Sequence, residues 1–145
     1  MSYIKIFLFG LMLCALGITG CSSSSVSSGF GSGSGYSINL TASNSQIPQG
    51  GGTSLIAAVR DAQGNPVTDS TIGVTFTSSI GATIVAQNQV SGSTTSGYPT
   101  GGIASATYTA PTVAILTTLP PSVTDQVTAS YRGAFATVSI HVYKP

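Results

Sequence analysis

The feature that most constrains the fold is an alternation of apolar and polar residues that begins at Tyr36 and recurs to the end of the chain. In "YSINLTA", residues 36–42, every second side chain is apolar. A period of two places alternate side chains on one face of an extended strand, whereas a helix requires a period of 3.6. No stretch after residue 36 follows the helical period. The sequence therefore predicts an all-β domain, whose inward positions are Tyr36, Ile38, Leu40, Ala42, Leu55, Ala57, Val59, Ile72, Val74, Phe76, Ala104, Ala106, Tyr108, Ala110, Val127, Ala129, Tyr131, Ala136, Val138, Ile140 and Val142.

Turn residues separate these alternating stretches. "DAQGNPV", residues 61–67, is a polar turn with Gly64 and Pro66 between two apolar stretches. Arg132 and Gly133 form a two-residue link between the last two stretches, which is typical of a tight β-hairpin. Short strands joined by such turns indicate an antiparallel β-sandwich.

The N-terminus has the pattern of an export signal. Lys5 precedes about a dozen apolar residues, and a membrane-spanning helix needs roughly 20. The segment ends in "ITGC", residues 18–21, which resembles the bacterial lipobox. The resemblance implies that residues 1–20 are a signal peptide, that cleavage precedes Cys21, and that Cys21 is lipidated. The alternatives are a plain signal peptide with an incidental cysteine, or an uncleaved anchor.

Residues 22–35 are Ser and Gly except for Val26 and Phe30. Such a composition buries too little surface to offset its ordering entropy, so it predicts a flexible tether with an average reach of ~20 Å. Its glycines neither follow a predicted strand nor open a helix, which excludes a phosphate-binding loop. Ser22, next to the lipobox cysteine, favours the outer membrane by analogy with enterobacterial lipoproteins.

Several motifs together give the domain a family resemblance. The segments "INLTAS", "AAVRDAQGNPV", "VTFTSS", "GIASATYTAP" and "VTASYRGAFATVSIHV" are similar to the bacterial immunoglobulin-like domains of the invasin/intimin group. The resemblance implies a single Greek-key β-sandwich over residues 36–145, whereas that group usually carries serial copies. On the immunoglobulin plan, loop 60–71 and the 132–133 turn share one end with the tether. Asp61 and Asp69 could therefore lie near Arg132, whereas loops 47–52 and 111–125 lie at the opposite end.

The charged and reactive residues exclude several functions. The mature part has three Asp, three basic residues and no Glu, so it has no basic patch for nucleic acid. His141 alternates with inward residues and should face outward, and no hydrolase or phosphate-loop motif occurs. Cys14 leaves with the signal and Cys21 carries lipid, so no thiol remains for a metal. We therefore expect no enzyme activity, small-molecule substrate, cofactor or metal.

Two segments are candidate contact sites. The connection "PTVAILTTLPPSV", residues 111–123, contains the apolar residues Val113, Ile115, Leu116 and Leu119. These side chains plug the end of the sandwich, add a short edge strand, or form a partner-binding loop that points away from the anchor. In the Gly-rich loop 88–102, Tyr98 is a candidate contact for sugar or protein, placed with Pro99 at the loop tip.

These features predict a non-enzymatic lipoprotein of the bacterial cell envelope. Its partners would be the membrane, through the N-terminal lipid, and an envelope protein bound by the immunoglobulin-like domain. The alternative is a carbohydrate- or peptidoglycan-binding module, for which only Tyr98 and Tyr143 are plausible exposed aromatic residues.

Overall fold

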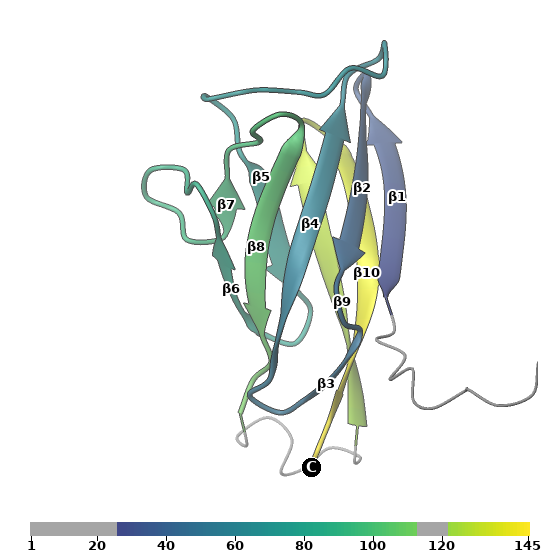
Figure 1. The fold of residues 1–145 in the computed structure, drawn as a ribbon, viewed down its shortest axis with the longest axis vertical. Helices are drawn as coiled ribbons and strands as arrows, with labels where there is room; N and C mark the ends of the chain where they lie inside the picture. The colour runs from purple at the N-terminus through teal and green to yellow at the C-terminus, as the bar shows by residue number, and fades with distance from the viewer. Residues whose placement is uncertain (1–25, 113–121) are drawn as a thin grey trace, which may run out of the picture.

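A computed structural model describes residues 26–112 and 122–145 of the chain, and within them it is all-β. The strands form two five-stranded sheets, β1-β2-β4-β8-β6 (sheet A) and β3-β10-β9-β5-β7 (sheet B), packed face to face (Figure 1). The all-β sandwich predicted from the alternation is confirmed. The strands are β1 (Ser27–Gly33), β2 (Tyr36–Ala42), β3 (Gln46–Pro48), β4 (Gly52–Arg60), β5 (Val74–Ser78), β6 (Thr83–Ala86), β7 (Ser96–Gly97), β8 (Ile103–Thr109), β9 (Ser122–Tyr131) and β10 (Ala134–Tyr143).

The strand order matches the immunoglobulin plan. Seven strands, taken in chain order as A to G, are β2, β4, β5, β6, β8, β9 and β10. Sheet A then contains the order ABED, and sheet B contains the order GFC. The strands β1, β3 and β7 are additions at the edges of these two sheets.

The core consists of the side chains that the alternation placed inward. Ile38, Leu55 and Phe76 are completely buried, as are most of the other predicted positions. Tyr36 is only half-buried, and Ile72 does not face the core, because it is 40% exposed and β5 begins two residues later, at Val74. The Asp69 carboxylate accepts hydrogen bonds from the backbone of Thr71 and Ile72, and this turn keeps Ile72 out of the strand.

The two ends of the sandwich differ in their connections. At one end, here called the hairpin end, lie the turn between β1 and β2, loop 61–73 and the 132–133 turn. Asp69 pairs there with Arg132. At the opposite end, the Ala110 amide donates to the Gly51 carbonyl at 2.9 Å, so segments 43–51 and 110–112 lie together. The predicted grouping of loop 60–71 with the 132–133 turn is confirmed.

The predicted tether over residues 22–35 is wrong for residues 27–33, which form the edge strand β1. Strand β1 pairs antiparallel with β2 from Ser27↔Ala42 to Gly33↔Tyr36. Ser34 and Gly35 join the two strands, and both have positive φ, as the tight hairpin turn requires. The folded domain therefore begins at β1, before the predicted boundary at Tyr36.

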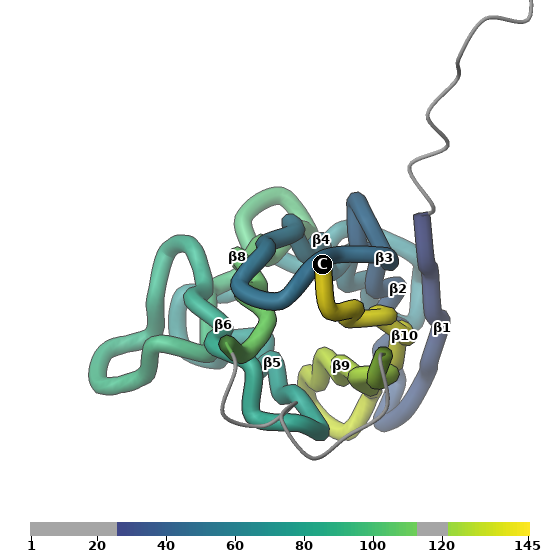
Figure 2. The backbone as a smooth tube through the Cα atoms, turned by 90° about the horizontal axis from the view of Figure 1, so that it is seen from below, coloured from purple at the N-terminus to yellow at the C-terminus, as the bar shows by residue number. Residues whose placement is uncertain are grey.

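The glycines of β1 explain why this Ser/Gly segment is ordered. Gly29, Gly31 and Gly33 face inward, and a Cβ on any of them would overlap a backbone carbonyl oxygen of Thr137, Phe135 or Gly133. Glycine thus lets β1 lie directly on the backbone of β10, and Figure 2 shows the two strands side by side. The rest of this edge of β10 pairs with β3 through residues 141–143. Two short segments therefore cover an edge that would otherwise expose hydrogen-bonding groups.

Strand β1 also reverses the predicted direction of chain entry. Because β1 runs antiparallel to β2, its first residue lies beside Ala42, away from the hairpin end. The prediction that the N-terminal segment enters at the hairpin end is wrong for this reason. The segment 113–121 itself lies outside the described residues. Its neighbours lie at the end opposite the hairpins, where Thr112 lies beside Gly50 and Ser122 pairs with Tyr143.

Candidate functional site

A buried carboxylate joins the two sheets near the end opposite the hairpins. Asp125 on β9 is completely buried, and Tyr108 on β8 donates its hydroxyl proton to Asp125 Oδ2 at 2.8 Å. The Ser78 hydroxyl donates to the same oxygen at 2.6 Å, and the Ser79 amide and hydroxyl donate to Oδ1 at 2.8 and 2.9 Å. Four donors thus satisfy the carboxylate inside the core, as burial of a charge requires.

This arrangement stabilises the fold and gives a substrate no access. Burial raises the pKa of Tyr108 far above its ordinary value, and the hydrogen bond to Asp125 raises the pKa further. Asp125 was not among the predicted interior residues, although it shares the inward register of Val127 and Ala129. The alternation alone predicts that Asp125 faces inward, because the period of two that includes Val127 and Ala129 extends back to residue 125.

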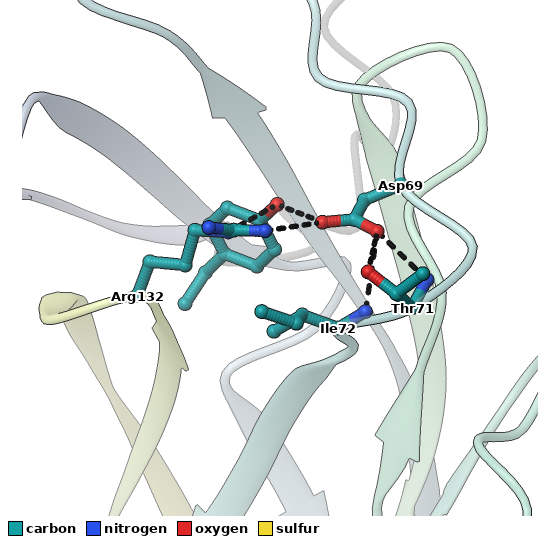
Figure 3. A network of polar contacts seen from close by, with 5 residues as sticks. Asp69, Thr71, Ile72 and Arg132 are labelled. Atoms are coloured by element: carbon teal, nitrogen blue, oxygen red, sulfur yellow. Dashed lines mark hydrogen bonds and ion pairs between the residues drawn. The ribbon is translucent and has the colours of Figure 1, made fainter.

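A second polar network lies at the hairpin end (Figure 3). Asp69 Oδ2 accepts hydrogen bonds from Arg132 Nη2 and from the Tyr131 hydroxyl, both at 2.9 Å. Asp69 Oδ1 accepts from the Thr71 hydroxyl at 2.6 Å, from the Thr71 amide at 2.7 Å and from the Ile72 amide at 3.2 Å. One carboxylate therefore ties loop 61–73 to the hairpin between β9 and β10.

The charges in this network stabilise one another. The hydrogen bonds from Thr71, followed by the bond from Arg132, hold the pKa of Asp69 well below its ordinary value. The Arg132 guanidinium also lies 5.7 Å from the ring centres of both Tyr36 and Tyr131, within the range of cation–π attraction. The predicted proximity of Asp69 and Arg132 is confirmed.

Asp61, which was also predicted to lie near Arg132, instead closes its own turn. Its Oδ1 accepts hydrogen bonds from the amides of Gln63 and Asn65, at 2.9 and 2.8 Å. These bonds, the one from Asn65 first, lower the pKa of Asp61. They account for the turn residues of "DAQGNPV", because the Asp61 side chain fixes the backbone that follows it.

Both networks are closed by hydrogen bonds within the chain. Both carboxylates already accept several hydrogen bonds, and no imidazole or thiol contacts them among the described residues. Within the same part of the chain, no group of three or more His, Cys, Asp or Glu residues could hold a metal ion. What the two networks do is join loops and sheets.

Of the residues predicted to make contacts, only Tyr98 and Tyr143 fall within the described part. Tyr98 is half-buried beside a buried Pro99, and its amide donates to the Asn88 carbonyl at 2.9 Å. The prediction placed Tyr98 at the tip of the loop, but in the structure it is partly covered and does not stand free. Tyr143 at the end of β10 is 42% exposed. Cys21, Val113, Ile115, Leu116 and Leu119 lie outside the described residues.

The outer faces of the two sheets differ in polarity. On sheet A, cross-strand pairing brings Phe30, Asn39, Ala58 and Ile103 into one row. Exposed apolar side chains on this face include Phe30, Ile56, Val85 and Ile103. On sheet B, most outer positions of β9 and β10 are polar, and three cross-strand pairs are hydrogen-bonded, namely Thr128 with Thr137, Gln126 with Ser139, and Thr124 with His141. The exposed apolar side chains of this face include Phe135 and Tyr143.

No helix in residues 26–112 or 122–145 has the length and hydropathy needed to cross a membrane. No family model matches the chain, and no curated protein matches it. Among solved structures, the chain is similar to the crystal structure of domains 4 and 5 of the S-layer protein SbsC, with a TM-score of 0.40 and 13% sequence identity. The match covers 76% of this chain and 65% of that one, so the chain spans about two thirds of that structure's length.

Proposed function

We propose that this protein is a bacterial envelope lipoprotein, lipidated on Cys21, that presents one immunoglobulin-like domain as a structural or protein-binding subunit and has no enzyme activity. The observation that carries the proposal is the sequence "ITGC" after a short apolar segment, six residues before the first strand. The folded domain begins so soon after Cys21 that lipidation would attach it closely to the membrane.

The chemistry of the domain supports a binding or structural role. Its polar clusters are satisfied internally, and no buried side-chain oxygen or nitrogen in the described residues lacks a hydrogen-bond partner. Its outer faces are flat sheets with few charges, which suit contact with another surface better than binding of a small molecule. By the analogy drawn from Ser22, we propose the outer membrane as its location.

Lipidation can be tested by expressing the full chain in a bacterium and determining the mass of its N-terminal peptide. We expect the mature protein to begin at Cys21 with acyl chains attached and to sediment with the membrane fraction. Cys21→Ala should remove the acyl mass and leave the signal peptide uncleaved. Cys14→Ala is the matched control and should be processed as the natural protein is. An unmodified Cys21, or equal acyl mass on the Cys21→Ala variant, would refute the proposal.

A further inference from the structure

The short distance in sequence between Cys21 and β1 limits where the domain can lie. Six residue steps separate Cys21 from Ser27, and a fully extended chain spans at most ~3.3–3.6 Å per residue, or about 20 Å in total. This reach is shorter than the ten-residue strands of the sandwich, which span about 33 Å at the usual rise per residue. A lipid on Cys21 would therefore hold part of the domain's surface close to the bilayer.

The exposed apolar side chains nearest to Cys21 in the described part lie at the start of the domain. Val26 is 61% exposed, and Phe30, on the outer face of β1, is 71% exposed. Phe30 lies in one cross-strand row with Ala58 and Ile103, in which Asn39 is the polar member, and Ile56 lies on the same face. The strand connected to Cys21 thus belongs to the more apolar of the two outer faces.

The charges of the domain disfavour contact of the hairpin end with an anionic bilayer, but they do not distinguish the two outer faces, because the outward positions of neither sheet include Asp or Glu. The outward positions of β1, β2, β4, β8 and β6 include no Asp or Glu, and their one charged residue is Arg60. Asp61 and Asp69 lie at the hairpin end, and Asp125 is buried. An anionic phospholipid surface would therefore meet no negative side chain on this face.

We propose that the outer face of sheet A lies on the lipid surface, with Phe30 in contact with the interfacial region of the bilayer. The proposal follows from the short link between Cys21 and β1, the exposed apolar side chains of this face and the absence of Asp and Glu from its outward positions. This inference rests on the lipidation proposed above. The partner of the outer face of sheet A is the phospholipid bilayer. Sheet B, with its hydrogen-bonded hydroxyl pairs, then faces away from the membrane and is the surface open to other envelope components.

The chain contains no tryptophan, so single-tryptophan variants can report contact with the bilayer. Phe30→Trp and Ile56→Trp place the reporter on the outer face of sheet A. Thr77→Trp places it on the outer face of sheet B, and Tyr143→Trp places it at the end opposite the hairpins. Each variant is purified in its acylated form and incorporated into vesicles of phosphatidylethanolamine and phosphatidylglycerol, with or without brominated acyl chains.

We expect the emission of Trp at positions 30 and 56 to shift to shorter wavelength and to be quenched severalfold more by brominated lipid than that of Trp at positions 77 and 143. Stronger quenching at position 143 would show an end-on orientation and overturn the inference. Equal, weak quenching at all four positions in an acylated, vesicle-bound protein would also overturn it, while leaving lipidation intact. An N-terminal peptide without acyl mass, with no sedimentation on vesicles, would instead refute the proposed function and the inference with it.

Discussion

The Tyr108 hydroxyl donates a hydrogen bond to the Asp125 carboxylate across the interior of the sandwich, from one sheet to the other. Both side chains are completely buried, so water cannot replace the bond if it is removed. The remaining donors come from Ser78 and Ser79, in the segment that follows β5. The sheets are thus joined by a charge-assisted bond as well as by apolar packing.

The first prediction follows from this bond. Tyr108→Phe should lower the free energy of unfolding by about 1.5–3 kcal/mol, the usual range for a hydrogen bond to a charged group. Tyr143→Phe is the matched control on an exposed tyrosine and should change stability by less than about 0.5 kcal/mol. Denaturant unfolding at neutral pH measures both values. Equal stabilities for the two variants would show that the Tyr108 bond contributes nothing.

The second prediction concerns the pH dependence of the network around Asp69. The folded-state pKa of Asp69 is lowered by Thr71 and then Arg132, so its contribution to stability is fully present above the ordinary carboxyl pKa of about 3.9 and is lost as the pH falls toward the lowered value. Asp69→Asn should therefore lower the melting temperature at pH 7. The difference from the natural protein should shrink as the pH falls below about 4. A difference that stays constant from pH 7 to pH 2 would contradict this account.

The third prediction tests whether β1 belongs to the folded domain. Gly31→Val places side-chain atoms where the Phe135 carbonyl lies, so β1 must shift away from β10. Overpacking of this kind costs about 1–3 kcal/mol. Ser32→Val, one residue later and facing outward, is the matched control and should be nearly neutral. If residues 27–33 were a tether, both variants would have the stability of the natural protein, and a protease would cut this segment equally well in all three.

The fourth prediction concerns the apolar residues between β8 and β9, which lie outside the described part of the chain. If Ile115 plugs the end of the core, Ile115→Ser should lower the free energy of unfolding by about 1.5–3 kcal/mol. We expect Leu119→Ser to be nearly neutral, because a proline pair such as residues 120–121 favours an extended chain and donates no backbone hydrogen bonds. Thermal melts of the two variants measure the effect. A large loss with Leu119→Ser would favour a plug over a partner-binding loop.

Where the sequence predicted the structure, it did so through burial of apolar side chains. Ile38, Leu40 and Val59 alternate with polar residues, and such a pattern has one arrangement that removes them from water. Strand β1 carries no such signal, because its inward residues are glycines whose role depends on the backbone of β10, about a hundred residues later. The prediction that Ile72 faces inward was wrong, because the Asp69 side chain accepts a hydrogen bond from the Ile72 amide and organises a turn. This local effect outweighs the alternation.

The candidate contact sites were less predictable than the core. Nothing in the residues around Tyr98 shows that the neighbouring Pro99 is buried. The loop that carries both is held to β5 and β6 by hydrogen bonds from the Phe76 and Ala86 amides to the Thr95 and Thr94 carbonyls, which form only in the folded domain. The sequence shows that Ile56 and Ala58 make the outer face of their strand apolar, but not that Phe30 and Ile103 join them. These residues become neighbours only when β1, β2, β4 and β8 pair in register.

The attachment of the chain through β1 also determines how the domain would respond to mechanical force. With Cys21 held in a membrane, a pull on the domain is applied at Ser27, the open end of the hairpin between β1 and β2. The load then breaks the pairs one at a time, beginning at Ser27↔Ala42, so β1 peels off before the other strands are strained. Its seven residues would lengthen the link to the membrane by up to about 23–25 Å. The strand that seals the edge of the sandwich is therefore also a store of extra length, released under tension and taken back when the tension falls.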